Sequence, residues 1–98
     1  MAKVVFTAAA RADIVAAHNW YEIRSPEAAS RFRDALQTIV ARIEMKPRQF
    51  PATSHRAQRA LLPGFPYLVI FRETAISAVV VAVFHSRRDP QGWGRRLT

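Results

Sequence analysis

An uninterrupted run of hydrophobic residues near the end of the chain predicts a strand at the centre of a sheet. Residues 78–84 are all Ala, Val or Phe, and a charge-free run rich in β-branched side chains is typical of a strand that is buried on both faces. Because side chains alternate along a strand, this run should present two different faces. We expect one face to carry Val79, Val81, Val83, His85 and Arg87, and the other to carry Ala78, Val80, Ala82, Phe84 and Ser86.

Apolar residues at helical spacing in the first half of the chain predict two amphipathic helices. The first helix follows a short strand at residues 3–6, takes Thr7 as its N-cap and runs to about Ile23. Ser25 and Pro26 begin the second helix, and Pro47 stops it. The two apolar stripes are Ala10, Ile14, Ala17 and Tyr21, and Phe32, Leu36, Ile39 and Ile43. Because only about two residues join the helices, we expect an antiparallel hairpin.

Turn signals divide the second half of the chain into three strand candidates. A loop at residues 47–55 leads to a partly polar edge strand at 56–62, which a Pro-Gly pair closes. A stronger strand follows at 67–72, and residues 73–75 lack the Gly or Asn of a two-residue hairpin turn. The order β-α-α-β-β-β predicts an α+β fold, in which a helical hairpin packs on one face of a small, mainly antiparallel sheet.

Length and composition are those of a folded, single-domain protein. The 98 residues suffice for one hydrophobic core, so we expect one domain over residues 1–98. The chain has no cysteine, and His18, His55 and His85 lack the paired spacing of a metal site, so we expect neither a metal nor a cofactor. No apolar run approaches the ~20 residues of a membrane span, and we expect a cytoplasmic protein.

Positive charge is concentrated in the second half of the chain. Residues 1–45 hold six Lys or Arg against five acids, a balance of +1, whereas residues 46–98 hold nine against two, a balance of +7. Thirteen of the fifteen basic residues are Arg, and guanidinium groups favour bidentate contact with phosphate or carboxylate. This pattern indicates an anionic partner, either nucleic acid or an acidic protein segment, unless the arginine content only reflects a biased genome.

The candidate chemistry lies where the hydrophobic run ends. An imidazole beside several guanidinium groups can act as a general acid or base near a phosphate whose charge the arginines stabilise. The candidates for catalysis are His85 and Arg87, with Arg72 and Arg59 on the neighbouring strands. The candidates for contact with a target are Arg87, Arg88, Asp89 and Trp93. The simpler alternative is that these residues only end a buried strand, pair locally and cover the core.

Three short motifs follow one another in the second half of the chain. They are Leu-Pro-Gly-Phe-Pro-Tyr at 62–67, Phe-Arg at 71–72 and Val-Phe-His-Ser-Arg-Arg-Asp-Pro at 83–90. Together with the order β-α-α-β-β-β, they resemble the ParE/RelE superfamily of toxins over nearly the whole chain. The resemblance implies a RelE/ParE-like fold and the toxin half of a type II toxin-antitoxin module, carried on a plasmid or a chromosome. It also implies a small ParD-like antitoxin that holds the toxin inactive in a hetero-oligomer.

The resemblance leaves the cellular target open. In the RelE-like branch the toxin is an enzyme that cleaves mRNA in the ribosome, and Arg59, Arg72, His85 and Arg87 are the nearest matches to its basic and His or Tyr side chains. In the ParE-like branch, which we favour, the toxin poisons DNA gyrase without being a nuclease. A third alternative is an inactive member that only binds its antitoxin. We expect an antitoxin to cover the helix pair and to run along the strand at 56–62.

Overall fold

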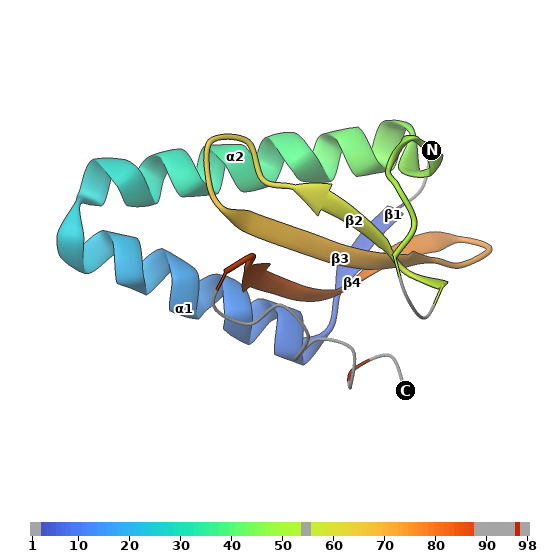
Figure 1. Cartoon of the computed structure of the whole chain (residues 1–98), viewed down its shortest axis with the longest axis horizontal. Coiled ribbons are helices and arrows are strands. Elements are labelled where there is room, and N and C mark those ends of the chain that lie inside the picture. Colours follow the sequence, from blue (N-terminus) through green and yellow to red (C-terminus); the bar gives the residue numbers. More distant parts are fainter. Residues whose placement is uncertain (1–2, 54–55, 88–95, 97–98) are drawn as a thin grey trace.

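The elements of the chain follow the order that the sequence predicts. The computed structural model describes residues 3–53, 56–87 and 96. It contains β1 (Lys3–Phe6), α1 (Ala8–Arg24), α2 (Pro26–Met45), a short 3-10 helix η1 (Pro47–Gln49), β2 (Gln58–Leu61), β3 (Tyr67–Glu73) and β4 (Ser77–His85). Figure 1 shows α1 and α2 as two antiparallel rods beside the strands. Within the described residues, no helix is both long and apolar enough to cross a membrane.

The four strands form one mixed sheet in the order β1-β4-β3-β2. β4 pairs in parallel with β1 and antiparallel with β3, whereas β2 pairs only with β3. The structure therefore confirms that the hydrophobic run is a central strand and that β2 lies at an edge. It also confirms a mainly antiparallel sheet, because only the β1–β4 pair is parallel.

Local capping residues set the ends of the helices. The Oγ1 atom of Thr7 accepts the Ala10 N–H at 3.1 Å, and the Oγ atom of Ser25 accepts the Ala28 N–H at 3.2 Å. Ser25 is the single residue between the helices, and its own N–H donates to the Tyr21 carbonyl at 2.6 Å. Pro26 needs no hydrogen-bond partner at the start of α2, because it has no N–H. The chain thus reverses within one residue, which enforces the antiparallel hairpin.

The main core lies between the helices and one face of the sheet. Its largest fully buried side chains from the helices are Phe32, Ile39 and Ile43, and those from the sheet side are Leu62, Val69, Phe71 and Val80. A second, smaller cluster on the other face of the sheet consists of Ala57, Ile70, Val81 and Ala82, with no residue from either helix. The helical hairpin therefore covers one face of the sheet, as the sequence predicts.

A β-bulge in β4 breaks the strict alternation that the sequence analysis assumes. Ile70 pairs with Ala82 and Phe71 pairs with Val80, so Val81 is an extra residue without a partner on β3. Beyond this point the faces exchange: Val83 packs in the main core, although Val79 and Val81 pack in the second cluster. The expected shared face of Val79, Val81, Val83, His85 and Arg87 is therefore wrong, because an inserted residue shifts the two-residue period by one.

The edge strand β2 is shorter than the predicted strand at 56–62. Arg56 has a φ of 60°, a left-handed backbone that ends any extended run, so β2 begins only at Gln58. The segment before it folds back along the outer edge, where the Arg59 N–H donates to the Pro51 carbonyl at 3.0 Å and the Thr53 N–H donates to the Ala57 carbonyl at 2.8 Å. Part of the edge at which we expected an antitoxin is therefore already paired.

Candidate functional site

The end of β4 is held in place by the loop that precedes β3. Gly64 in this loop has a φ of +78°, a conformation that residues with a Cβ adopt only under strain. The Leu62 N–H donates to the Tyr67 carbonyl at 2.9 Å, which closes the loop, and the Ser86 N–H donates to the Pro66 carbonyl at 2.9 Å. The Leu-Pro-Gly-Phe-Pro-Tyr motif therefore positions the residues that follow β4.

Aromatic rings from four parts of the chain pack together beneath this end of the sheet. Tyr21 of α1 lies with its ring centroid 5.6 Å from that of Phe32 in α2 and 5.1 Å from that of Phe65 in the loop. Phe32 in turn lies 5.6 Å from Tyr67, the first residue of β3. The Tyr21–Phe32 pair is stacked, whereas the other two contacts are edge-to-face. Such contacts favour particular ring orientations as well as burying area, so the base of the site is well packed.

His85 extends this aromatic cluster toward the surface. It pairs with Tyr67 across the sheet, and the two ring centroids lie 5.3 Å apart in an edge-to-face arrangement. The backbone N–H of Arg87 donates to Nδ1 of His85 at 3.2 Å. Since Nδ1 accepts this hydrogen bond, the neutral imidazole carries its proton on Nε2. This hydrogen bond and the contact with Tyr67 orient the half-buried ring.

Asp13 on α1 joins the helix to the unpaired edge of β4. The β1 strand ends at Phe6, opposite Val80, so the next backbone groups of β4 need other partners. The Val83 N–H donates to Oδ2 of Asp13 at 2.9 Å, and Arg96 donates to the Val81 carbonyl at 3.0 Å. Arg96 also binds both carboxylate oxygens of Asp13, at 2.5 and 3.1 Å. The Asp13–Arg96 ion pair thus supplies hydrogen-bond partners for backbone groups of β4 that lie beyond the end of β1.

A hollow of about 320 Å³ lies between α1 and the end of β4. Its lining consists of Asp13, Ala16, Ala17, Trp20, Tyr67, Val83, Phe84 and His85. Aromatic and aliphatic side chains make up most of this wall, and Asp13, Tyr67 and His85 are its titratable groups. The Asp13 carboxylate is engaged by Arg96 and the Val83 N–H. The hollow therefore brings His85 together with Asp13, Tyr67 and Trp20, rather than with the predicted arginines.

The structure separates the predicted catalytic residues. Arg72 pairs with Val79, six residues before His85 along β4, which is about 20 Å at ~3.3 Å per residue. Arg59 is exposed on β2 opposite Ile70, so it shares the face of the second cluster, whereas His85 shares the face of Tyr67 and the main core. Arg87 is exposed in the turn after β4 and not on the strand. Of the three arginines predicted for catalysis, only Arg87 therefore lies beside His85.

Several predicted residues lie outside the described part of the chain. These are His55 among the histidines and Arg88, Asp89 and Trp93 among the target-binding candidates. His18 is on α1, where its Nε2 atom contacts the Arg33 guanidinium of α2. Among the described residues, no three His, Asp or Glu side chains are grouped so that they could hold a metal ion.

Asp13 and Tyr67 are site residues that the sequence analysis missed. Asp13 lies three residues after buried Ala10 and four before buried Ala17, so its position is on the core-facing stripe of α1. An acidic residue on such a stripe indicates a specific partner, because a charge is rarely buried unpaired. Tyr67 could have been placed beside His85 only by knowing that the bulge shifts the β3–β4 register.

We expect Asp13→Ala to lower the free energy of unfolding by about 2 kcal/mol, because it leaves the Val83 N–H without its acceptor. Asp13→Asn retains an oxygen for this N–H and should cost less. Urea denaturation of the two variants measures the difference. Asp34→Ala, at an exposed position of α2, is the matched control and should change stability by no more than about 0.5 kcal/mol. Equal effects of Asp13→Ala and Asp34→Ala would contradict the role of Asp13.

A comparison with models of protein families shows which family the chain belongs to. Residues 4–90 match the model of the ParE toxin of type II toxin-antitoxin systems, parDE. The chain belongs to the ParE toxin family. Among solved structures, a chain described as the chromosomal ParDE TA system from P. aeruginosa superposes with a TM-score of 0.75. It is 19% identical, and the match covers 87% of this chain and 96% of that one. No curated protein sequence matches the chain.

Membership of the ParE family confirms the resemblance seen in the sequence. The solved structure, which is 19% identical, shows that the two chains share a fold. In this chain the fold consists of two helices and a four-stranded mixed sheet. The match to residues 4–90 extends over the end of β4 and the turn after it.

Proposed function

We propose that the chain is the toxin of a type II toxin-antitoxin system and arrests growth by poisoning DNA gyrase. The family match over residues 4–90 carries this proposal. The working surface is the end of β4, where exposed Arg87 follows the fixed imidazole of His85. The other candidates for contact with the target are Arg88, Asp89 and Trp93, which follow in the sequence and lie outside the described residues. A net charge of +8 favours association with an anionic target such as the gyrase–DNA complex.

An antitoxin that neutralises the chain is the second part of the proposal. The family description names a toxin of a toxin-antitoxin system, and the related solved structure is described as a ParDE system. Exposed apolar side chains on α1, including Val15 and Ile23, offer a surface for an amphipathic helix. β1 pairs only with β4 within the described sheet, so its other edge is better suited to an added strand than the partly covered edge of β2.

Ribosome-dependent cleavage of mRNA is the alternative function. The contact between His85 and Tyr67 favours it, because it pairs two titratable side chains at the predicted site. The separation of Arg59 and Arg72 from His85 counts against it, since those arginines then cannot stabilise a phosphate beside the imidazole. Gyrase poisoning needs no such cluster and is therefore the function we favour.

Two assays of the purified protein distinguish these functions. One contains DNA gyrase with supercoiled plasmid, and the other contains translating ribosomes with mRNA. We expect gyrase-linked DNA breaks to accumulate and the message to stay intact. Cleaved message, with cleavage lost in His85→Ala, would overturn the gyrase proposal in favour of a nuclease. No activity in either assay, from protein that still binds its antitoxin, would favour the inactive, binding-only alternative.

A further inference from the structure

A second and larger hollow, of about 660 Å³, lies at the other end of the sheet. One wall consists of residues 45–49, where α2 ends and η1 follows, and the other consists of residues 73–77 in the β3–β4 hairpin. Ser77 begins β4 and His85 ends it, so roughly 26 Å of strand separates this hollow from the candidate site at ~3.3 Å per residue. A ligand in this hollow would leave the end of β4 free.

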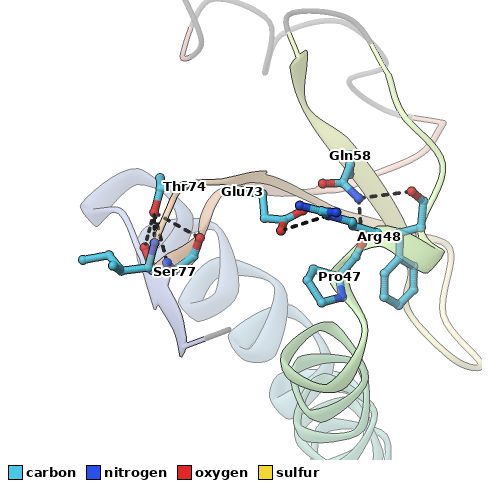
Figure 2. Close-up of polar contacts among 8 residues, drawn as sticks. Pro47, Arg48, Gln58, Glu73, Thr74 and Ser77 are labelled. Atoms are coloured by element: carbon cyan, nitrogen blue, oxygen red, sulfur yellow. Dashed lines mark hydrogen bonds and ion pairs between the residues drawn. The ribbon is translucent and has the colours of Figure 1, made fainter. Parts of the chain in front are cut away.

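Hydrogen bonds hold both walls of this hollow in shape (Figure 2). On the hairpin side, the Thr74 N–H donates to the Ser77 carbonyl at 2.7 Å and the Ser77 N–H donates to Oγ1 of Thr74 at 3.0 Å. On the η1 side, Nε2 of Gln58 donates to the carbonyls of Pro47 at 2.6 Å and Phe50 at 3.2 Å. A ligand therefore meets a surface that is already ordered, which lowers the entropic cost of binding.

Two aliphatic side chains at the hollow are unusually exposed. Ile76 at the tip of the hairpin is 85% exposed, and Met45 at the end of α2 is 66% exposed. Single exposed apolar residues are ordinary on protein surfaces. These two, however, come from elements far apart in the sequence and line one hollow, which is typical of a site that buries them against a partner.

The charged side chains of the hollow leave an excess of positive charge. Lys46 and Arg48 lie in the same wall, opposite Glu73. Nε of Arg48 lies 3.7 Å from Oε2 of Glu73, which is too long for a hydrogen bond, and the Arg48 side chain is 90% exposed. Lys46 forms no ion pair with any described residue. The hollow can therefore accept at least one further carboxylate.

We propose that this hollow binds a segment of the antitoxin in which an aliphatic side chain stands next to an Asp or Glu. The aliphatic side chain would pack between Met45 and Ile76, and the carboxylate would bind Lys46 and Arg48. A nucleic acid fits less well, because Glu73 repels phosphate and a phosphate backbone buries neither aliphatic residue. This inference rests on the proposed function, since it assumes that an antitoxin exists.

Affinity measurements on the purified chain and its antitoxin test the charge contacts. We expect Lys46→Glu with Arg48→Glu to raise the Kd about tenfold or more at low salt, whereas Arg56→Glu with Arg59→Glu, an equal change of charge at exposed positions in and just before β2, should raise it less. The first pair should still arrest growth in the absence of antitoxin, because it lies far from Arg87. An unchanged Kd would overturn the inference.

Thiol labelling tests the aliphatic contact directly, because the chain has no cysteine of its own. We expect the antitoxin to slow maleimide labelling of Ile76→Cys at least tenfold, and to leave Leu61→Cys, at an exposed position of β2, reactive. Unprotected Ile76→Cys would overturn the inference, as would protection by a short DNA duplex in place of the antitoxin. A chain that binds antitoxin through this hollow without arresting growth would contradict only the proposed function.

Discussion

Cells that express the chain with Arg87→Glu and Arg88→Glu should continue to grow, whereas cells that express the unaltered chain should stop. Arg87 is exposed in the turn after β4, and its structural contact uses the backbone N–H, which the substitution retains. At Arg87, the change therefore removes a cationic group from the proposed working surface without removing a buried interaction with the described residues. Colony counts after induction, with equal protein levels verified by immunoblot, measure the effect.

The control for this pair must change the net charge by the same amount. Each pair of reversals lowers the net charge from +8 to +4. Arg11→Glu with Arg31→Glu places the change on exposed positions of α1 and α2, and it should leave growth arrest intact. Persistent arrest in the Arg87→Glu, Arg88→Glu variant, with an unchanged melting temperature, would show that the turn after β4 is not the working surface.

Val81→Asp should prevent stable folding. Val81 is 6% exposed and packs with Ile70 and Ala82 on the face opposite the helices. An ionised carboxylate at this position would be buried among the apolar side chains of this cluster, so we expect a loss of more than about 3 kcal/mol from a total stability that is typically about 5–15 kcal/mol. Circular dichroism during heating should show no cooperative transition, or one at a much lower temperature.

Val15→Asp is the matched control, because Val15 is exposed on α1. This substitution should lower the free energy of unfolding by less than about 1 kcal/mol, because Val and Asp have similar helix propensities and the position is exposed. A Val81→Asp protein that melts at the temperature of Val15→Asp would refute the burial of β4 in the centre of the sheet.

Sequence reasoning succeeded where the signals are local. Thr7 and Ser25 cap the helices as predicted, because a cap acts on residues three positions away. The hydrophobic run became the central strand, because only a strand with neighbours on both sides needs such a composition. These features determine the fold class, and they depend on short stretches of the sequence.

Sequence reasoning failed where two distant segments determine the outcome. The bulge at Val81 shifts the pairing of β4 with β3 by one residue, so that His85 lies on the same face as Tyr67. The contact between Asp13 and Arg96 joins residues that are 83 positions apart. The expected cluster of His85 with Arg59 and Arg72 fails for two reasons. Antiparallel pairing places Arg72 opposite Val79, six residues before His85, and the inserted residue places Arg59 and His85 on opposite faces of the sheet.

The strand order has a consequence for folding during synthesis. β4 lies between β1 and β3, yet it is the last strand to leave the ribosome, and β1 has no strand neighbour within the described sheet until β4 arrives. The helical hairpin can form early from local contacts, whereas closing the sheet must wait until β4 has been synthesised. The domain should therefore complete its fold only after β4 has left the ribosome.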